Sequence, residues 1–83
     1  PKLSEERRKD IIKIASEFAE NSKVAIRNIR REYIDLSKNE KKDTNLSEDE
    51  LKKNINEIQK VTDNFIKKIE EIFESKKIDI MKV

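Results

Sequence analysis

The stretch "KNEKKDTNLSEDEL" (Lys38–Leu51) divides the chain into two parts and decides its fold. Its first part, up to residue 45, carries no apolar side chain, so it predicts the end of one helix and a loop. Ser47 and Glu50 then have the spacing of a capping box, and Leu46 and Leu51 flank them as a hydrophobic staple. The stretch therefore predicts that a second helix begins at residue 47.

The first helix is expected to begin near the start of the chain. Ser4 is a suitable N-cap, and the acidic residues Glu5 and Glu6 suit the positive end of the helix dipole. The predicted elements are a helix over about 5–39, a loop over about 40–46 and a helix over about 47–80. We therefore predict an all-α fold, in which two long antiparallel helices form a helical hairpin within one helical domain spanning residues 1–83.

The composition supports long helices and excludes several classes of function. The 83 residues include no Gly and one Pro, and 46% of them are charged. The chain has no Cys or His, no Gly-rich phosphate loop and no metal-ligand spacing. We therefore expect no catalytic residues, no metal site and no cofactor. No apolar run approaches membrane length. Because Pro1 is not preceded by a Met, we expect the chain to be a fragment or a processed product.

Each predicted helix carries more apolar surface than a two-helix contact needs. The main seam of the first helix is Ile12, Ala15, Ala19, Ser22, Ile26, Ile29, Tyr33 and Leu36, with Ile11, Ile14, Phe18 and Ala25 beside it. The main seam of the second is Leu51, Ile55, Ile58, Thr62, Phe65, Ile69 and Ile72, widened by Val61, Ile66, Phe73 and Ile80. Two seams per helix predict two neighbours for each helix. The hairpin is therefore expected to be part of a three-helix bundle, and the isolated chain is expected to self-associate.

The stretch "VAIRNIRREY" (Val24–Tyr33) concentrates arginine, and all five arginines of the chain lie in the first predicted helix. A helical projection gathers basic residues on one side, away from the Ile and Phe seams: Lys9, Lys13, Lys23, Arg27, Arg30, Arg31, Lys38 and Lys41. Ile34 falls among them, an unexpected place for an apolar side chain. A basic stripe rich in guanidinium groups favours a phosphate backbone as ligand. The alternative is that these charges only solvate a long helix and pair at i, i+4.

Three motifs resemble the C-terminal part of bacterial-type ribosome recycling factor. They are "LSEERRKDIIKIA", "VAIRNIRRE" and "IQKVTDNFIKKIEEIFESKKIDIMKV", which run in order from Leu3 to Val83. The resemblance implies an L-shaped protein with a bundle of three long helices and a small β-rich domain inserted between the first and second helices. This chain would supply the second and third helices of that bundle, and lack the first helix and the inserted domain.

The resemblance also implies a function without catalysis. Such factors, with elongation factor G and GTP, split the ribosome that remains on messenger RNA after termination, and their helical domain touches ribosomal RNA of the large subunit. The family's key basic positions correspond to Arg27 and Arg30, with Asn28 and Arg31 beside them. Together with Lys23 on the same basic side, these residues form the predicted RNA-binding set. Tyr33 departs from the small residue expected there.

The resemblance places the protein in the cytoplasm, with an organelle matrix as the alternative. A rival hypothesis from another class also remains at this point. The chain would then be a self-associating helical-hairpin or coiled-coil module that does not bind RNA. The salt dependence of ribosome binding discriminates between the two hypotheses.

Overall fold

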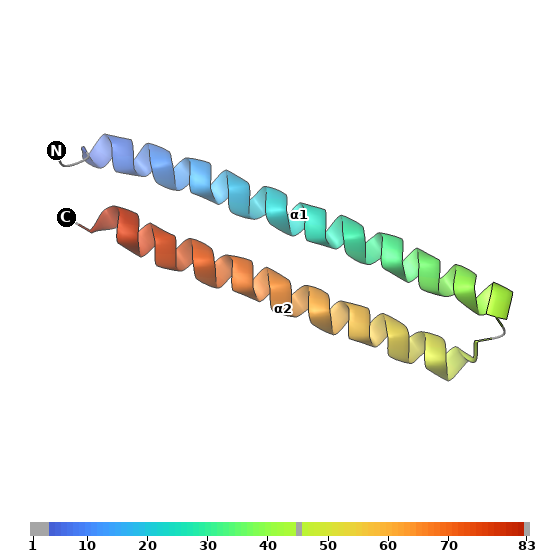
Figure 1. Ribbon diagram of the computed structural model, residues 1–83. Coiled ribbons are helices and arrows are strands. Elements are labelled where there is room, and N and C mark those ends of the chain that lie inside the picture. The colour runs from blue at the N-terminus through green and yellow to red at the C-terminus, as the bar shows by residue number, and fades with distance from the viewer. Residues whose placement is uncertain (1–3, 45, 83) are drawn as a thin grey trace.

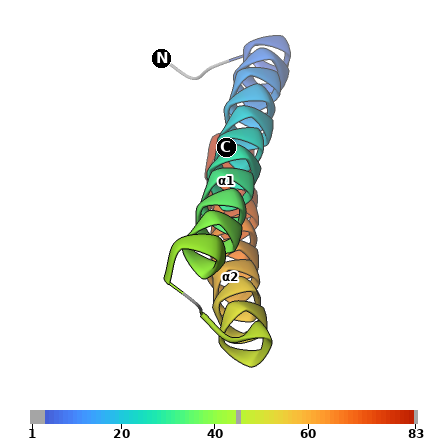
Figure 2. The same ribbon diagram turned by 90° about the vertical axis from the view of Figure 1, so that its right-hand side faces the viewer.

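The fold is a hairpin of two antiparallel α-helices, as the sequence predicted (Figure 1). Helix α1 spans Glu5–Thr44 and has 40 residues, and helix α2 spans Glu48–Met81 and has 34 residues. The structure is a computed structural model that describes residues 4–44 and 46–82, without the side chains of residues 41, 43 and 44. The start of α1 and the end of α2 lie at the same end of the hairpin, and the side view shows one helix lying along the other (Figure 2).

The hairpin is a thin rod. Its extents are 64 × 15 × 12 Å, and its radius of gyration is 18.9 Å. A compact chain of this length would have a radius of gyration of about 12 Å. Among the residues that the structure describes, no hydrophobic side chain is fully buried, and Thr62 is the one buried residue, at 5% exposure. The two helices therefore pack along a line of contact without enclosing a core.

Serine side chains begin both helices, which confirms the predicted caps. Ser4 Oγ accepts a hydrogen bond from the backbone N–H of Arg7 at 3.1 Å. Ser47, with φ −69° and ψ 158°, accepts one from the backbone N–H of Glu50 at 3.1 Å. Each bond satisfies a donor that the first turn of a helix leaves unpaired. Both serines therefore fix where their helices begin.

Helix α1 ends later than predicted, because it continues to Thr44 where residue 39 was expected. The extension is rich in Lys and Glu, which are good helix formers, and contains no Gly or Pro that would stop a helix. A polar stretch can therefore remain helical, and the connection is shorter than the predicted 40–46. Within it, Asn45 lies outside the described residues.

The contact between the helices differs from the predicted seam beyond Ala19 in α1 and beyond Thr62 in α2. On α1 the half-buried row is Ile12, Ala15, Ala19, Lys23, Ile26, Arg30, Ile34 and Ser37, and on α2 the corresponding row is Leu51, Ile55, Ile58, Thr62, Ile66, Ile69, Phe73 and Ile80. The prediction placed Ser22, Ile29, Tyr33 and Leu36 on the first row and Phe65 and Ile72 on the second. Those assignments were wrong by one residue each.

The physical reason is the helical period. Strict alternation of three and four residues follows a 3.5-residue repeat, whereas a straight α-helix has 3.6 residues per turn. The observed rows include consecutive four-residue steps, for example from Ala15 through Ala19 to Lys23. The shift answers the question raised by Ile34, which is half-buried on the side that faces α2.

Most of the displaced apolar residues, though not Leu36, line two pockets between the helices, which we together call the groove. Its larger part, about 590 Å³, is lined by Ile26, Ile29, Arg30, Tyr33, Glu57, Ile58, Val61, Thr62 and Phe65. A second part, about 410 Å³, is lined by Ala15, Phe18, Ala19, Ser22, Ile69, Ile72, Phe73 and Lys76. Phe18 is 71% exposed, Tyr33 56% and Phe65 55%. The hairpin therefore leaves large apolar side chains in water along this groove.

Candidate nucleic-acid interface

The candidate interface is built on the middle of α1. Lys23, Arg27 and Arg31 follow one another at four-residue spacing, so they lie in one row along the helix surface. Asn28 and Arg31 are exposed, whereas Lys23, Arg27 and Arg30 are half-buried. The structure therefore places the five predicted residues together on one segment of α1, but not all in the same environment.

Arg31 and Asn28 are joined to each other. Arg31 Nη1 donates a hydrogen bond to Asn28 Oδ1 at 2.8 Å, across one turn of the helix. The contact holds the guanidinium group in place and uses one of its five N–H donors. The remaining donors can form the planar, two-pronged contact that guanidinium makes with phosphate.

The three clustered arginines have no carboxylate partner among the described side chains. Between residues 4 and 82, apart from the few side chains left undescribed, no carboxylate forms an ion pair with Arg27, Arg30 or Arg31. Arg27 and Arg31 carry like charges at i, i+4, an arrangement that disfavours an isolated helix by a few tenths of a kcal/mol. Their positive charge is available to an anionic ligand.

The position of Arg30 differs from the prediction, which placed this residue away from the apolar seams. It lines the larger part of the groove, beside Ile26 and Ile29 of its own helix and Ile58 of α2. The cause is the same shift that brings Ile34 toward α2, because the contact row passes through position 30. Arginine tolerates this position because its aliphatic stem can cover apolar surface while its charged group stays in water.

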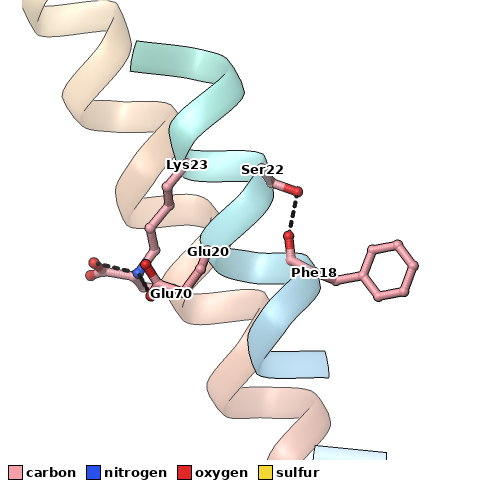
Figure 3. A network of polar contacts seen from close by, with 5 residues as sticks. All are labelled: Phe18, Glu20, Ser22, Lys23 and Glu70. Carbon is pink, nitrogen blue, oxygen red and sulfur yellow. Dashed lines mark hydrogen bonds and ion pairs between the residues drawn. The ribbon is translucent and has the colours of Figure 1, made fainter. Parts of the chain in front are cut away.

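Lys23 lies between two carboxylates, one from each helix (Figure 3). Its Nζ is 3.2 Å from Glu20 Oε1 on α1 and 3.3 Å from Glu70 Oε1 on α2. The lysine side chain is only 14% exposed, whereas those of Glu20 and Glu70 are 64% and 57% exposed. The hydrogen bond to Glu20 raises the pKa of Lys23 most, desolvation lowers it, and the bond to Glu70 raises it further. Of the five predicted residues, Lys23 is thus the one whose charge is already paired.

The helical projection already places Glu20 on the basic side of α1, but sequence reasoning missed Glu70 and the ion pairs that both carboxylates form with Lys23. The three-residue spacing of Glu20 and Lys23 is a signal that could have been used. Glu70 lies far away in the sequence, and finding it requires the register between the helices.

In Figure 3 the Phe18 ring points away from both helices, and the Phe18 carbonyl accepts a 2.8 Å hydrogen bond from Ser22 Oγ.

Within the ranges that the structure describes, no group of three or more His, Cys, Asp or Glu residues could hold a metal ion. The same ranges contain no helix with the length and apolar character needed to cross a membrane.

These observations define a slender hairpin of two helices that has an apolar groove and a cluster of arginines without an ion pair in the described part of the chain. The family model described as "Ribosome recycling factor" matches residues 1–81. The ribosome-recycling factor of Prochlorococcus marinus (strain NATL1A) is 54% identical over 83 residues, which are 100% of this chain and 46% of that protein. The factor of Caulobacter sp. (strain K31) is 52% identical over 83 residues, 100% of this chain and 44% of the relative.

A third relative with the same name comes from Thermus thermophilus and is 49% identical over 81 residues, 98% of this chain and 44% of the relative. The chain belongs to the ribosome recycling factor family. It spans about half the length of the curated relatives that it matches.

Proposed function

We propose that this chain is the RNA-contacting part of a ribosome recycling factor. In this proposal Arg27, Arg30 and Arg31, with Asn28 beside them, bind ribosomal RNA of the large subunit. The observation that carries the proposal is the cluster of arginines without carboxylate partners on a chain of this family. RNA of the ribosome presents a dense array of phosphates, which is recognised mainly through shape and backbone.

The absence of pairing argues against a face that serves only solubility. A solvated helix surface is usually laced with i, i+4 pairs of opposite charge. Lys9 follows that pattern, with its Nζ 3.8 Å from Glu5 Oε1. Among the described residues Arg27 and Arg31 form no such pair, although Asp35 stands four residues after Arg31. The repulsion between the like charges of Arg27 and Arg31 lowers the stability of the free protein, and bound phosphates would offset it.

The partners and the mechanism follow from the family. In the complete protein, the helical part would dock on the large subunit, and elongation factor G with GTP would supply the force that splits the post-termination ribosome. The role is mechanical and needs no catalytic residue. The cytoplasm is the expected location, with an organelle matrix as the alternative.

The groove supports a place for this chain within a three-helix bundle. Its apolar lining comes from both helices, so a third helix lying in it would contact α1 and α2 together. Large exposed apolar patches of this kind normally mark an interface. The relatives are about twice as long as this chain, which leaves room in them for such a helix.

The test is binding of the complete protein to purified large ribosomal subunits at several salt concentrations. Neutralised phosphates release counterions, so the affinity should fall steeply as salt rises. Binding that ignores salt, or no binding by a well-folded protein, would refute the RNA contact. Self-association without ribosome binding would instead support the helical-module rival.

A further inference from the structure

The ion pair between Lys23 and Glu70 joins the two helices, and Lys23 stands one turn before Arg27 in the sequence of α1. Lys23 Nζ lies 3.2 Å from Glu20 on its own helix and 3.3 Å from Glu70 on α2. Three charged groups in this arrangement carry a net charge of about −1 when all are ionised. A phosphate approaching Lys23 would meet two carboxylates that already occupy the ammonium group. Direct contact between Lys23 and RNA is therefore unfavourable.

The position of Lys23 links its ion pair with Glu70 to the orientation of the arginines on α1. Lys23, Arg27 and Arg31 share one row at four-residue spacing, so any rotation of α1 about its axis moves all three together. A rotation of that kind would separate Lys23 from Glu70. The ion pair therefore resists a movement that would also change the direction in which Arg27 and Arg31 point.

We propose that Lys23 is a positioning residue, whose ion pair with Glu70 fixes the rotation of α1 and thereby the direction in which Arg27 and Arg31 point. The inference rests on the proposed function, because it assumes that these arginines bind phosphate. It reassigns Lys23 from an RNA contact to a tie between the helices.

A charge exchange in the complete protein tests this role. Lys23→Glu alone should weaken binding to the large subunit by about fivefold and lower the melting temperature, because it places three carboxylates together. Adding Glu70→Lys restores an ion pair with reversed polarity. The double variant should recover binding to within about twofold of the wild type, together with most of the melting temperature.

The matched control also reverses one positive and one negative charge. Its positive residue is Arg27, which has no ion pair with Glu70 that the exchange could restore. Arg27→Glu should weaken binding strongly, and adding Glu70→Lys should not restore it, because Lys23 then loses its carboxylate partner on α2. The two double variants have the same net charge, so a difference between them cannot come from overall electrostatics. The measurements are equilibrium binding at two salt concentrations and thermal melting.

The outcomes separate this inference from the proposed function. If the wild type binds but Lys23→Glu with Glu70→Lys stays as weak as Lys23→Glu alone, Lys23 contacts RNA directly and the positioning role is wrong. Equal recovery of both double variants would also overturn it. If the wild type does not bind, or Arg27→Glu binds as the wild type does, the proposed function itself fails.

Discussion

At the scale of single residues, partial burial of Arg27 and Arg30 and a hydrogen bond to Arg31 would favour the proposed binding. A free arginine side chain loses up to about 2 kcal/mol of rotamer entropy when it is fixed in a complex. Arg27 and Arg30 are half-buried, and Arg30 lies against the apolar lining of the groove. Arg31 is held by its 2.8 Å hydrogen bond to Asn28. Part of this side-chain entropy is therefore already lost when the protein folds. Less is then lost on binding, so the net binding free energy is more favourable.

Arg27→Ala and Arg30→Ala in the complete protein should each weaken binding to the large subunit. A lost charge-assisted hydrogen bond to phosphate is worth about 1.5–3 kcal/mol, or about tenfold to a hundredfold in affinity. Lysine at either position should rescue binding only in part, because it lacks the planar fork. Titration of purified subunits, with circular dichroism as a check of folding, measures the effect. Arg30→Ala should also cost some stability, since its stem lines the groove.

The control for these variants is Lys67→Ala, which removes an exposed positive charge from α2. It should change binding much less than either arginine variant. If Lys67→Ala weakens binding while Arg27→Ala and Arg30→Ala do not, the RNA-binding face has been assigned to the wrong helix.

Phe65 and Ile66 provide a direct test of the helix register. In the isolated chain, studied at low concentration, Phe65→Ala should cost less than about 1.5 kcal/mol because the ring is 55% exposed. In the complete protein, a third helix in the groove would bury the ring and raise that cost to about 3–5 kcal/mol. Ile66→Ala should be destabilising in both proteins, because Ile66 faces α1 in the half-buried row. Equal costs for Phe65→Ala in the two proteins would argue against a helix in the groove.

At the scale of the helices, the starts are set by local chemistry. Ser47→Ala removes the side-chain acceptor for the Glu50 N–H, and should destabilise the hairpin by about 1 kcal/mol. Ser75→Ala is the matched control, because Ser75 is exposed inside α2 and Ala is a better helix former. Urea denaturation of both variants measures the difference. A loss for Ser75→Ala as large as that for Ser47→Ala would show that the cap does not define the start of α2.

The sequence predicted those features that local chemistry determines. Both serine caps, the two helices and their antiparallel hairpin could be read from short stretches of residues. The end of α1 could not, because Lys and Glu permit a helix without requiring one. The contact row departed from the prediction after Ala19 in α1 and after Thr62 in α2, since a small difference in period accumulates with length. For the same reason the prediction placed Arg30 away from the groove, and Glu70 beside Lys23 was not foreseen.

At the scale of the whole molecule, the side of the hairpin that carries the groove exposes large apolar side chains. The groove side gathers Phe18, Ile29, Tyr33 and Phe65 in water. Apolar burial stabilises association by about 25 cal/mol for each Å² removed from water. Because no hydrophobic side chain in the described residues is buried, covering this groove would stabilise the hairpin.

The isolated 83-residue chain should therefore form a dimer or a larger assembly through the groove. Sedimentation over a range of concentrations measures this association. Phe65→Asp should weaken it, because the substitution places a charge in the groove. Ile78→Asp is the control, since Ile78 is 60% exposed and is not among the groove residues. A monomer at every concentration would contradict the prediction.

The length of the hairpin has a mechanical consequence. The rod is 64 Å long, and its clustered arginines lie near the middle of α1 rather than at an end. A rod attached at one place near its centre resists sliding but can rotate about that attachment point. A push near the loop would swing the opposite end in the reverse direction, with a displacement that grows with distance from the pivot. To hold a rod of this shape at a fixed angle, a binding site would need a second point of support far from the arginines.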